Sequence, residues 1–395
     1  MLQFQCATFR VRLSRGFHAI SKSHRDNPQV TSFYDSTVSN YCNKPPSPVK
    51  LGDLLKFGKP PLSTEALLSS ARYAHSELPV RLARRVQAFQ KLPFIVGTNP
   101  YIKGVHQMYY DSFEKLRGFP APVDKETDDN YTDSLTELTQ QFADTIPKLA
   151  QGFMECKKYM KSDDIANFFD DLIRARIGIR LIAEQHVALH YASGAYIGII
   201  DTQLNPTNLL RHCAGYVQEL CEMTYGSAPE FIINGQTDTL FTYIPVHLEY
   251  IACELLKNAF RATVEYSRKS NRLHHPSIEI TVTCGEEHVG VRIRDQGGGI
   301  PPEHQEGIFQ YSYTTVKHDE EEEKDSSIFS AQTQLAMQSG VGGPIAGLGF
   351  GLPMALVYAK YFGGDLIVRS LTGYGCDVFL SLQNIGNTAT GTMQI

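Results

Sequence analysis

The stretch ELLKNAFRATVE, residues Glu254–Glu265, lies mid-chain and combines an acid, a lysine, an amide and an arginine in one predicted helix. Because residues four apart on an α-helix share a face, the Glu254 carboxylate and the Asn258 carboxamide point the same way, while the apolar residues can pack elsewhere. Lys257 and Arg261 belong to the same helix. A solvated helix surface can carry the same residue types, so the rest of the chain must decide between surface and site.

The composition of the chain is that of ordinary globular proteins. Its 395 residues suffice for two domains, and 42% of them are hydrophobic and 20% charged. The formal net charge of −5 gives no basic excess, which argues against a nucleic-acid binder. No apolar run approaches the ~20 residues that a membrane span needs. The eight cysteines show no CxxC pair, so we expect reduced, mostly buried thiols.

The first 25 residues have the composition of a mitochondrial presequence. They contain five lysines and arginines, and no acidic residue precedes Asp26. The alternative is an arbitrary basic leader, since no apolar core of secretory-signal length is present. We therefore predict a presequence and flexible leader over residues 1–45, with cleavage before residue 45.

The sequence pattern changes near residue 226. From about residue 48 to 225 the apolar residues recur at helical spacing without clear strand alternation, which predicts an antiparallel, four-helix-type bundle over residues 46–225. Pro79 interrupts the first long helical stretch and predicts two helices or one kinked helix.

Strand signals dominate the second half. EFIING and TLFTYIPV precede the Glu254 helix, and SIEITVTCGEEHVGVRIRDQGGGI and LIVRSLTGYGCDVFLSL alternate as hairpins do. An acidic and then Gly-rich segment between the two hairpins predicts a mobile loop. The fold class is therefore two-domain α+β, with an α/β domain over residues 226–385, a mobile segment over about 312–350, and a tail over 386–395.

Two glycine-rich motifs follow the helix. In DQGGGIP, Asp295 ends a strand and can accept a hydrogen bond from an exocyclic amine, and Gly297 and Gly299 let the backbone approach a flat ring such as adenine. GLGFGLP, which begins at Gly347, precedes an apparent helix whose N-terminal amides suit phosphate oxygens. Glycine clusters also serve turns and caps, but their order behind an acid-amide helix favours an ATP site.

The acid-amide helix would complete that site. Asn258 can give an oxygen to Mg²⁺, whose other positions are filled by phosphate oxygens and water. Glu254 can take a proton from an attacking hydroxyl or water in phosphoryl transfer.

These motifs resemble those of the GHKL ATPases (gyrase, heat-shock chaperone, histidine kinase, MutL), with ELLKNAFRATVE as the N-box and DQGGGIP and GLGFGLP as glycine boxes. Residues of about 50 to 385 resemble the mitochondrial 2-oxoacid dehydrogenase kinases, because SARYAHSELPVRLARRVQAFQKLPFIVGTNP and RARIGIRLIAEQH are similar to that family's bundle domain. The resemblance implies a helical bundle followed by a GHKL (Bergerat) α/β ATPase sandwich.

The resemblance also implies roles for single residues. Glu254 would be the general base toward a substrate serine, Asn258 the Mg²⁺ ligand and Asp295 the adenine contact. The other predicted nucleotide contacts are Lys257, Arg261, Gly297, Gly299, Thr314, Thr315, Gly347, Leu348, Gly349, Phe350, Gly351 and Leu352.

An inhibitory pocket for small 2-oxoacids is implied in the bundle. Arg176 and Arg180 would capture the carboxylate, with Tyr109 and Ser112 as neighbours. The alternative is that the two arginines pair with helix-surface carboxylates, namely Asp170, Asp171 or Glu184.

Three departures bear on the substrate and the ions. Tyr250 stands where many pyruvate dehydrogenase kinases have a histidine, and the chain has no tryptophan for the Asp-Trp tail of typical animal pyruvate dehydrogenase kinases. Both slightly favour the branched-chain 2-oxoacid dehydrogenase kinase. Gln310 replaces an acidic residue that helps to bind K⁺ in that kinase, which argues against a K⁺ requirement.

The implied activity is that of an ATP- and Mg²⁺-dependent serine kinase of the mitochondrial matrix, which inactivates the α-subunit of a branched-chain or pyruvate dehydrogenase complex. The implied partners are a second copy of the chain and a lipoyl domain of the acyltransferase core. The rival functions are a histidine kinase, for which no convincing His-Glu or His-Asp box is present, and a non-catalytic ATP-binding scaffold. His186 and His190 have the i, i+4 spacing of a metal pair, but the sequence indicates no third ligand, so hydrogen-bonded helix histidines are the favoured interpretation.

Overall fold

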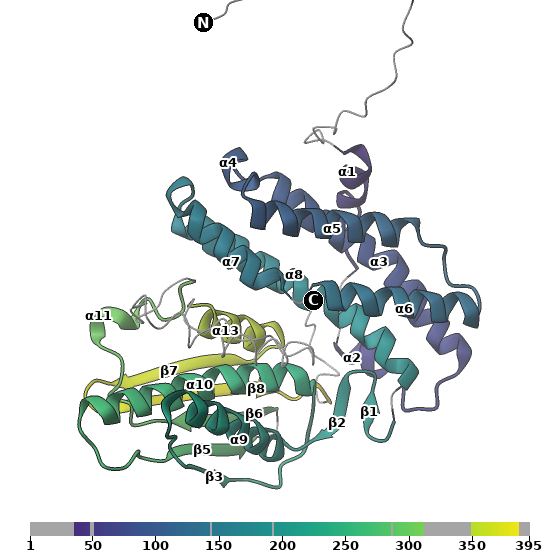
Figure 1. Cartoon of the computed structure of the whole chain (residues 1–395). Coiled ribbons are helices and arrows are strands. Elements are labelled where there is room, and N and C mark those ends of the chain that lie inside the picture. Colours follow the sequence, from purple (N-terminus) through teal and green to yellow (C-terminus); the bar gives the residue numbers. More distant parts are fainter. Residues whose placement is uncertain are drawn as a thin grey trace, which may run out of the picture. The chain divides into compact units, whose positions relative to one another are not determined.

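The computed structural model describes residues 35–47, 51–142, 144–191, 193–285, 287–311 and 349–386 (Figure 1). A helical domain comes first along the chain. Its helices are α1 (Ser36–Cys42), α2 (Leu51–Leu55), α3 (Thr64–Gln90), α4 (Phe94–Gly97), α5 (Pro100–Gly118), α6 (Lys125–Gln141), α7 (Thr145–Cys156) and α8 (Ser162–Tyr191), with a 3₁₀ turn at Lys157–Tyr159.

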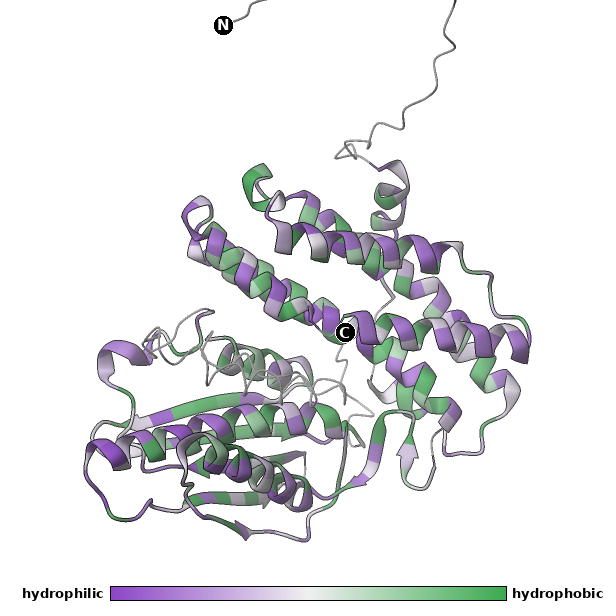
Figure 2. Cartoon of the chain, viewed as in Figure 1, coloured by the Kyte–Doolittle hydropathy of each residue, from purple (hydrophilic) through white to green (hydrophobic). Residues whose placement is uncertain are grey.

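Local sequence sets where these helices begin. The Ser63 hydroxyl accepts a hydrogen bond from the Ala66 amide at 3.2 Å at the start of α3. Asn99 caps α5, which opens on Pro100, and Asp124 and Thr127 form a capping box at the start of α6. Hydrophobic and hydrophilic residues recur in turn along each long helix in Figure 2, as expected of helices that bury one side.

Helix α3 lies at the centre of the bundle, because it packs against α5, α6 and α8. Pro79 lies inside α3, so of the two predicted alternatives the one with two separate helices is wrong, and a single helix continues through the proline. The residues around it explain why: Leu78, Leu82 and Val86 are fully buried, and their burial outweighs the roughly 3 kcal/mol that an interior proline costs.

A three-stranded antiparallel sheet follows the bundle, in the order β1-β2-β4. It joins β1 (Tyr196–Ile197) and β2 (Ile200–Leu204) to β4 (Phe241–Tyr243). The strand pattern did not reveal β1 and β2, because strands of two and five residues are too short for a periodicity.

The second domain is built on a five-stranded sheet in the order β3-β5-β6-β8-β7. Its strands are β3 (Phe231–Gly235), β5 (Ile278–Cys284), β6 (His288–Arg294), β7 (Asp365–Leu371) and β8 (Gly375–Gln383). Only β3 and β5 are parallel, and the two predicted hairpins are present as β5-β6 and β7-β8. The family-based prediction of a two-domain α+β fold is confirmed.

Helices α9 (Pro206–Tyr225), α10 (Pro245–Lys269) and α13 (Gly351–Tyr361) cover one face of this sheet, and α11 (Pro302–Gln305) follows the first glycine motif (Figure 1). The inward strand residues are apolar, for example Ile280, Val291 and Leu380. Helix α9 packs against α10 and β3, whereas the boundary predicted after residue 225 assigned it to the bundle.

Aromatic side chains connect the bundle to the second domain at helix α8. The Phe169 ring lies 4.9 Å from the Phe350 ring and 5.3 Å from the Tyr311 ring, between centroids, and the Tyr311 hydroxyl donates a hydrogen bond to Asp170. Residues 312–348 of the predicted mobile segment, residues 1–34 of the leader and residues 387–395 of the tail lie outside the described residues. Among the described helices, none is both long and apolar enough to cross a membrane.

Candidate active site

Helix α10 presents the acid-amide pair. Its Leu256, Ala259 and Phe260 are buried in the core, which fixes the rotation of the helix. Glu254 is buried as well, at 7% exposure, and Lys257 donates to its Oε1. Asn258, one turn further on, is exposed to solvent. The carboxylate of the pair is therefore buried and its amide is in contact with solvent. This arrangement suits a buried group that accepts a proton beside a group that binds a hydrated ion.

The last glycine motif meets the Glu254 carboxylate. A Cβ added to Gly351 would lie 2.2 Å from Glu254 Oε2, so only glycine leaves room for this carboxylate. Gly351 is the first residue of α13, whose N-terminal amides receive no side-chain cap. The chain thus places uncapped amides, which suit a phosphate oxygen, beside a carboxylate that can accept a proton.

Asp295 lies at the end of β6 and is buried, at 6% exposure. Its Oδ1 accepts hydrogen bonds from the Gly297 amide at 2.8 Å and the Cys376 amide at 3.3 Å. Burial raises the pKa of this carboxyl to about 6, although the two hydrogen bonds act in the opposite direction. A buried, fixed carboxylate is a suitable acceptor for an adenine amine.

The glycines after Asp295 pack closely against their neighbours. Gly297 lies against Ala262 of α10, where a Cβ would come within 2.6 Å of the Ala262 Cβ. Gly299 has φ +71°, and a Cβ there would lie 2.4 Å from the Leu371 carbonyl oxygen. This motif is therefore held between α10 and the β7-β8 hairpin.

The structure does not bring every predicted nucleotide contact to this place. Arg261 pairs with Glu265 of its own helix at 2.6 Å. The Phe350 side chain packs toward the bundle, so only its backbone is available to a phosphate. Gly349 has φ +72°, and Leu352 lies in the first turn of α13. Four predicted contacts lie outside the described residues, namely Thr314, Thr315, Gly347 and Leu348.

Both domains match known families. Residues 48–201 match the model of the mitochondrial branched-chain alpha-ketoacid dehydrogenase kinase, and residues 243–384 match that of the histidine kinase-, DNA gyrase B- and HSP90-like ATPases. The chain is also 36% identical over 345 residues to the mitochondrial pyruvate dehydrogenase (acetyl-transferring) kinase of Arabidopsis thaliana, a similarity that covers 86% of this chain and 91% of the relative. This chain belongs to the mitochondrial 2-oxoacid dehydrogenase kinase family.

Mammalian relatives agree with this membership. The chain is 30% identical over 375 residues to isozyme 4 of the mitochondrial pyruvate dehydrogenase kinase of Mus musculus, which covers 91% of this chain and 86% of the relative. Isozyme 1 of Mus musculus is 29% identical over 377 residues, or 91% and 82% of the two chains. The predicted family and the predicted protein-kinase activity are confirmed, and the GHKL domain makes the chain an ATP-binding kinase.

One residue near Glu254 was missed from the sequence. Tyr358 of α13 lies 4.8 Å from Tyr250, between ring centroids, and Tyr250 lies one turn before Glu254 on α10. Burial, and then the charge of Glu254, raise the pKa of Tyr250 well above its usual value, so this phenol stays neutral. The helical spacing in the sequence could have identified Tyr358, because it follows Gly351 by two turns of the same helix and therefore lies on the same face.

Three of the four residues predicted to bind an oxoacid, Arg176, Tyr109 and Ser112, are buried in the bundle of the kinase. Arg176 is buried and donates Nη1 to the Phe142 carbonyl oxygen, and none of the described carboxylates forms an ion pair with it. The Tyr109 hydroxyl is buried and has no hydrogen-bond partner among the described residues. Ser112 donates to the Met108 carbonyl at 2.7 Å.

Arg180 differs from Arg176. Its Nη2 lies 2.5 Å from Glu184 Oε1, so one of the two arginines pairs as the alternative interpretation expected. Arg180, Glu184, His247, Tyr250 and Tyr358 line a cavity of about 10 Å³, together with Ile177 and Val246. That volume is about enough for one water molecule.

Proposed function

We propose that this kinase transfers the γ-phosphoryl group of Mg·ATP to a serine of a 2-oxoacid dehydrogenase α-subunit and thereby inactivates it. The observation that supports this best is the Glu254 carboxylate, which is buried, paired with Lys257 and in contact with Gly351 at the uncapped start of α13. A base and a phosphate-binding helix end in contact are what transfer to a hydroxyl needs.

In the proposed reaction, Glu254 accepts the serine proton while the serine oxygen forms a bond to the γ-phosphorus. The bond from that phosphorus to the β–γ bridging oxygen breaks, and ADP leaves with its electron pair. The amides at the start of α13 stabilise the negative charge of the transferred group. Asn258 fits Mg²⁺ because it presents a hard amide oxygen to solvent, and the ion would neutralise the phosphates.

Pyruvate dehydrogenase is the substrate that the relatives favour, because those named above are all pyruvate dehydrogenase kinases. Tyr250 and the missing tryptophan favoured the branched-chain enzyme, and the bundle also matches the model named for the branched-chain kinase. We propose the pyruvate dehydrogenase α-subunit as the substrate and the branched-chain α-subunit as the second candidate.

Parallel phosphorylation with radiolabelled ATP tests both proposals. We expect serine label on the pyruvate dehydrogenase α-subunit, and a loss of about 10²–10⁴-fold in the Glu254→Gln variant with ATP binding retained. Glu265→Gln is the matched control, because the same substitution on the exposed part of α10 should leave the rate unchanged. Label on the branched-chain subunit alone would reverse the choice of substrate. Unchanged activity of Glu254→Gln would exclude Glu254 as the base.

A 2-oxoacid would inhibit the kinase from the bundle. We propose that its carboxylate binds the Arg176 guanidinium and that its oxo group accepts a hydrogen bond from Tyr109, since both are buried without an anionic or hydrogen-bonding side-chain partner among the described residues. The Arg176→Met variant should lose inhibition by pyruvate and by a branched 2-oxoacid. Inhibition that persists unchanged would place the pocket elsewhere.

We also propose the mitochondrial matrix as the location, recruitment by a lipoyl domain of the acyltransferase core, and a homodimer. The mitochondrial names of the relatives support the location, and family membership supports the partners.

Helix α1 lies within the predicted leader, yet its Val38 is buried in the bundle core. The presequence should therefore end before Ser36, which N-terminal sequencing of the mature protein would show.

Gln310 is uncharged, so we propose that kinase activity needs no K⁺. Replacing K⁺ with Na⁺ in the assay checks this proposal.

A further inference from the structure

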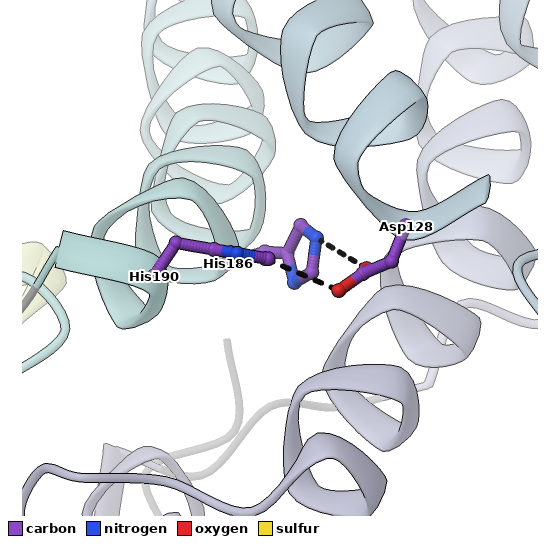
Figure 3. Close-up of side chains that lie close together, drawn as sticks. All are labelled: Asp128, His186 and His190. Atoms are coloured by element: carbon purple, nitrogen blue, oxygen red, sulfur yellow. Dashed lines mark ion pairs between the residues drawn. The ribbon is translucent and has the colours of Figure 1, made fainter. Parts of the chain in front are cut away.

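A cluster of metal-binding side chains lies in the bundle, far along the chain from the N-box. Figure 3 shows Asp128 from α6 facing His186 and His190, which follow each other by one turn on α8. Asp128 Oδ1 lies 3.3 Å from His186 Nε2, and Asp128 Oδ2 lies 3.3 Å from His190 Nε2. Asp128 is the third ligand that the sequence did not indicate.

These distances fit a shared metal ion better than hydrogen bonds. Nitrogen-to-oxygen hydrogen bonds are usually about 2.7–3.2 Å long, and Asp128 Oδ1 accepts none from any described residue. Around a tetrahedral zinc with bonds of about 2.0–2.1 Å, neighbouring ligand atoms lie about 3.3–3.4 Å apart. The two spacings between Asp128 and the histidines equal that tetrahedral edge, and all three ligand atoms lie within 4.8 Å of one another.

The charge of the cluster also favours a cation. The His186 side chain is fully buried. Asp128 is almost fully buried and faces these two imidazoles. A divalent ion between this carboxylate and the two imidazoles would offset the cost of burying the carboxylate.

Hydroxyl groups around the cluster orient the rings. Ser70 Oγ of α3 lies 3.2 Å from His186 Nδ1, so it can accept that N–H and leave the Nε2 lone pair for a metal. Thr132 donates its proton to the Asp128 backbone carbonyl at 2.9 Å. Its oxygen lies within hydrogen-bonding distance of both rings, 3.1 Å from His186 Nε2 and 3.2 Å from His190 Nε2.

We propose that Asp128, His186 and His190 bind one Zn²⁺, with a water as the fourth ligand. Two imidazoles select a transition metal over Mg²⁺ or Ca²⁺, and the partly exposed His190 leaves a path for the ion and the water. The ion joins α6 to α8, and Ser70 extends the connection to α3. Its role is to stabilise the bundle, because it lies apart from the Glu254 site and contacts none of the residues assigned there.

The test uses the full chain, stripped with a chelator and then equilibrated with Zn²⁺. We expect one more zinc per chain in the wild type than in His190→Phe, by elemental analysis. The comparison is a difference because cysteines such as the exposed Cys284 also bind zinc. At zinc a hundredfold above its dissociation constant, the melting midpoint should rise by about 5 °C in the wild type and not in the variant. His212→Phe, an exposed histidine on α9, is the control and should behave as the wild type does.

Cobalt gives a second reading that does not depend on stability. Co²⁺ in the wild type should show the visible absorption of a tetrahedral site, and both His190→Phe and Asp128→Asn should lose it. Equal zinc content and equal melting shifts in wild type and His190→Phe would overturn the proposal, and the cluster would then be a hydrogen-bonded core without a metal.

Discussion

Two carboxylates of the candidate ATP site have different surroundings. Asp295 is buried and holds two backbone amides, and Glu254 is buried beside a lysine and a glycine. Asp295 can hold a ligand in place, because its carboxylate is fixed by backbone amides. Glu254 contacts Gly351, at the start of the helix where a phosphate would bind. Neither environment can be inferred from the residue type alone, since both are acids in a glycine-rich context.

The raised pKa of Asp295 predicts a pH-dependent affinity for ATP. The folded-state value of about 6 exceeds the ordinary 3.8, so the carboxyl is protonated below about pH 6 and loses its best acceptor oxygen. The dissociation constant of ATP should therefore rise as the pH falls below 6. For the same reason, this group lowers the free energy of unfolding progressively as the pH rises from 3.8 to 6.

Calorimetric titration with ATP between pH 5 and 8 measures the effect on binding. In Asp295→Asn the affinity should be weaker throughout and should not follow this pH dependence. An identical pH profile in the two proteins would assign the dependence to another group.

Gly351 predicts a catalytic defect from a single methyl group. In Gly351→Ala the new Cβ would overlap Glu254 Oε2 and displace the carboxylate, and a displacement of about 1 Å costs roughly 10²-fold in rate. Gly215→Ala on α9 is the matched control, because its Cβ would meet nothing within 4 Å. Steady-state kinetics should show a lower kcat for the first variant only. A normal kcat in Gly351→Ala would argue against Glu254 as the base.

At the scale of elements, α8 connects the two domains. One end of this helix carries Phe169, which contacts Tyr311 and Phe350 on either side of residues 312–348. Arg176, two turns later on the same helix, belongs to the proposed oxoacid pocket. A rigid helix that contacts both sites is a physical route for coupling between them.

Removing the Phe169 ring should weaken nucleotide binding. In Phe169→Leu the aromatic contacts to Tyr311 and Phe350 are lost while an apolar side chain remains, so we expect a several-fold rise in the dissociation constant of ATP. Phe153→Leu is the control, because Phe153 packs against Phe168 and Phe169 and has no ring contact with the second domain among the described residues. Equal ATP affinities of the two variants would show that this contact does not support the nucleotide site.

At the scale of the whole molecule, the second face of the five-stranded sheet is the candidate dimer surface. It carries Ile367 and Phe379 opposite each other on β7 and β8, exposed by 42% and 43%. Charged residues lie beside them, with Arg294 3.6 Å from Asp377. An apolar pair within a polar surround is typical of the centre of an interface.

A charge at this face should prevent dimer formation. Phe379→Glu should elute at the mass of one chain in light scattering coupled to size exclusion, with the wild type at two chains. Leu273→Glu is the control, because Leu273 is exposed by 95% in the loop after α10. A dimeric Phe379→Glu would place the interface on another face.

Local sequence determined much of this protein. The Glu254 helix, the two hairpins and the order of the glycine motifs follow from periodicities and from residues whose chemistry acts over a few positions, and they led to the family and the fold class. Such signals are short-range, so they fixed element types well and boundaries less well. They left open whether Pro79 ends a helix, and burial of the surrounding leucines and valine keeps α3 a single helix there.

Contacts between distant segments were decided only by the tertiary structure. Asp128 lies 58 residues before His186 in the sequence yet 3.3 Å from it in space, and Gly351 reaches Glu254 across most of the second domain. The sequence contains each of these residues but no record of their distance, because packing of whole helices sets it. Which carboxylate meets a glycine, and which meets two histidines, was therefore visible only in the folded chain.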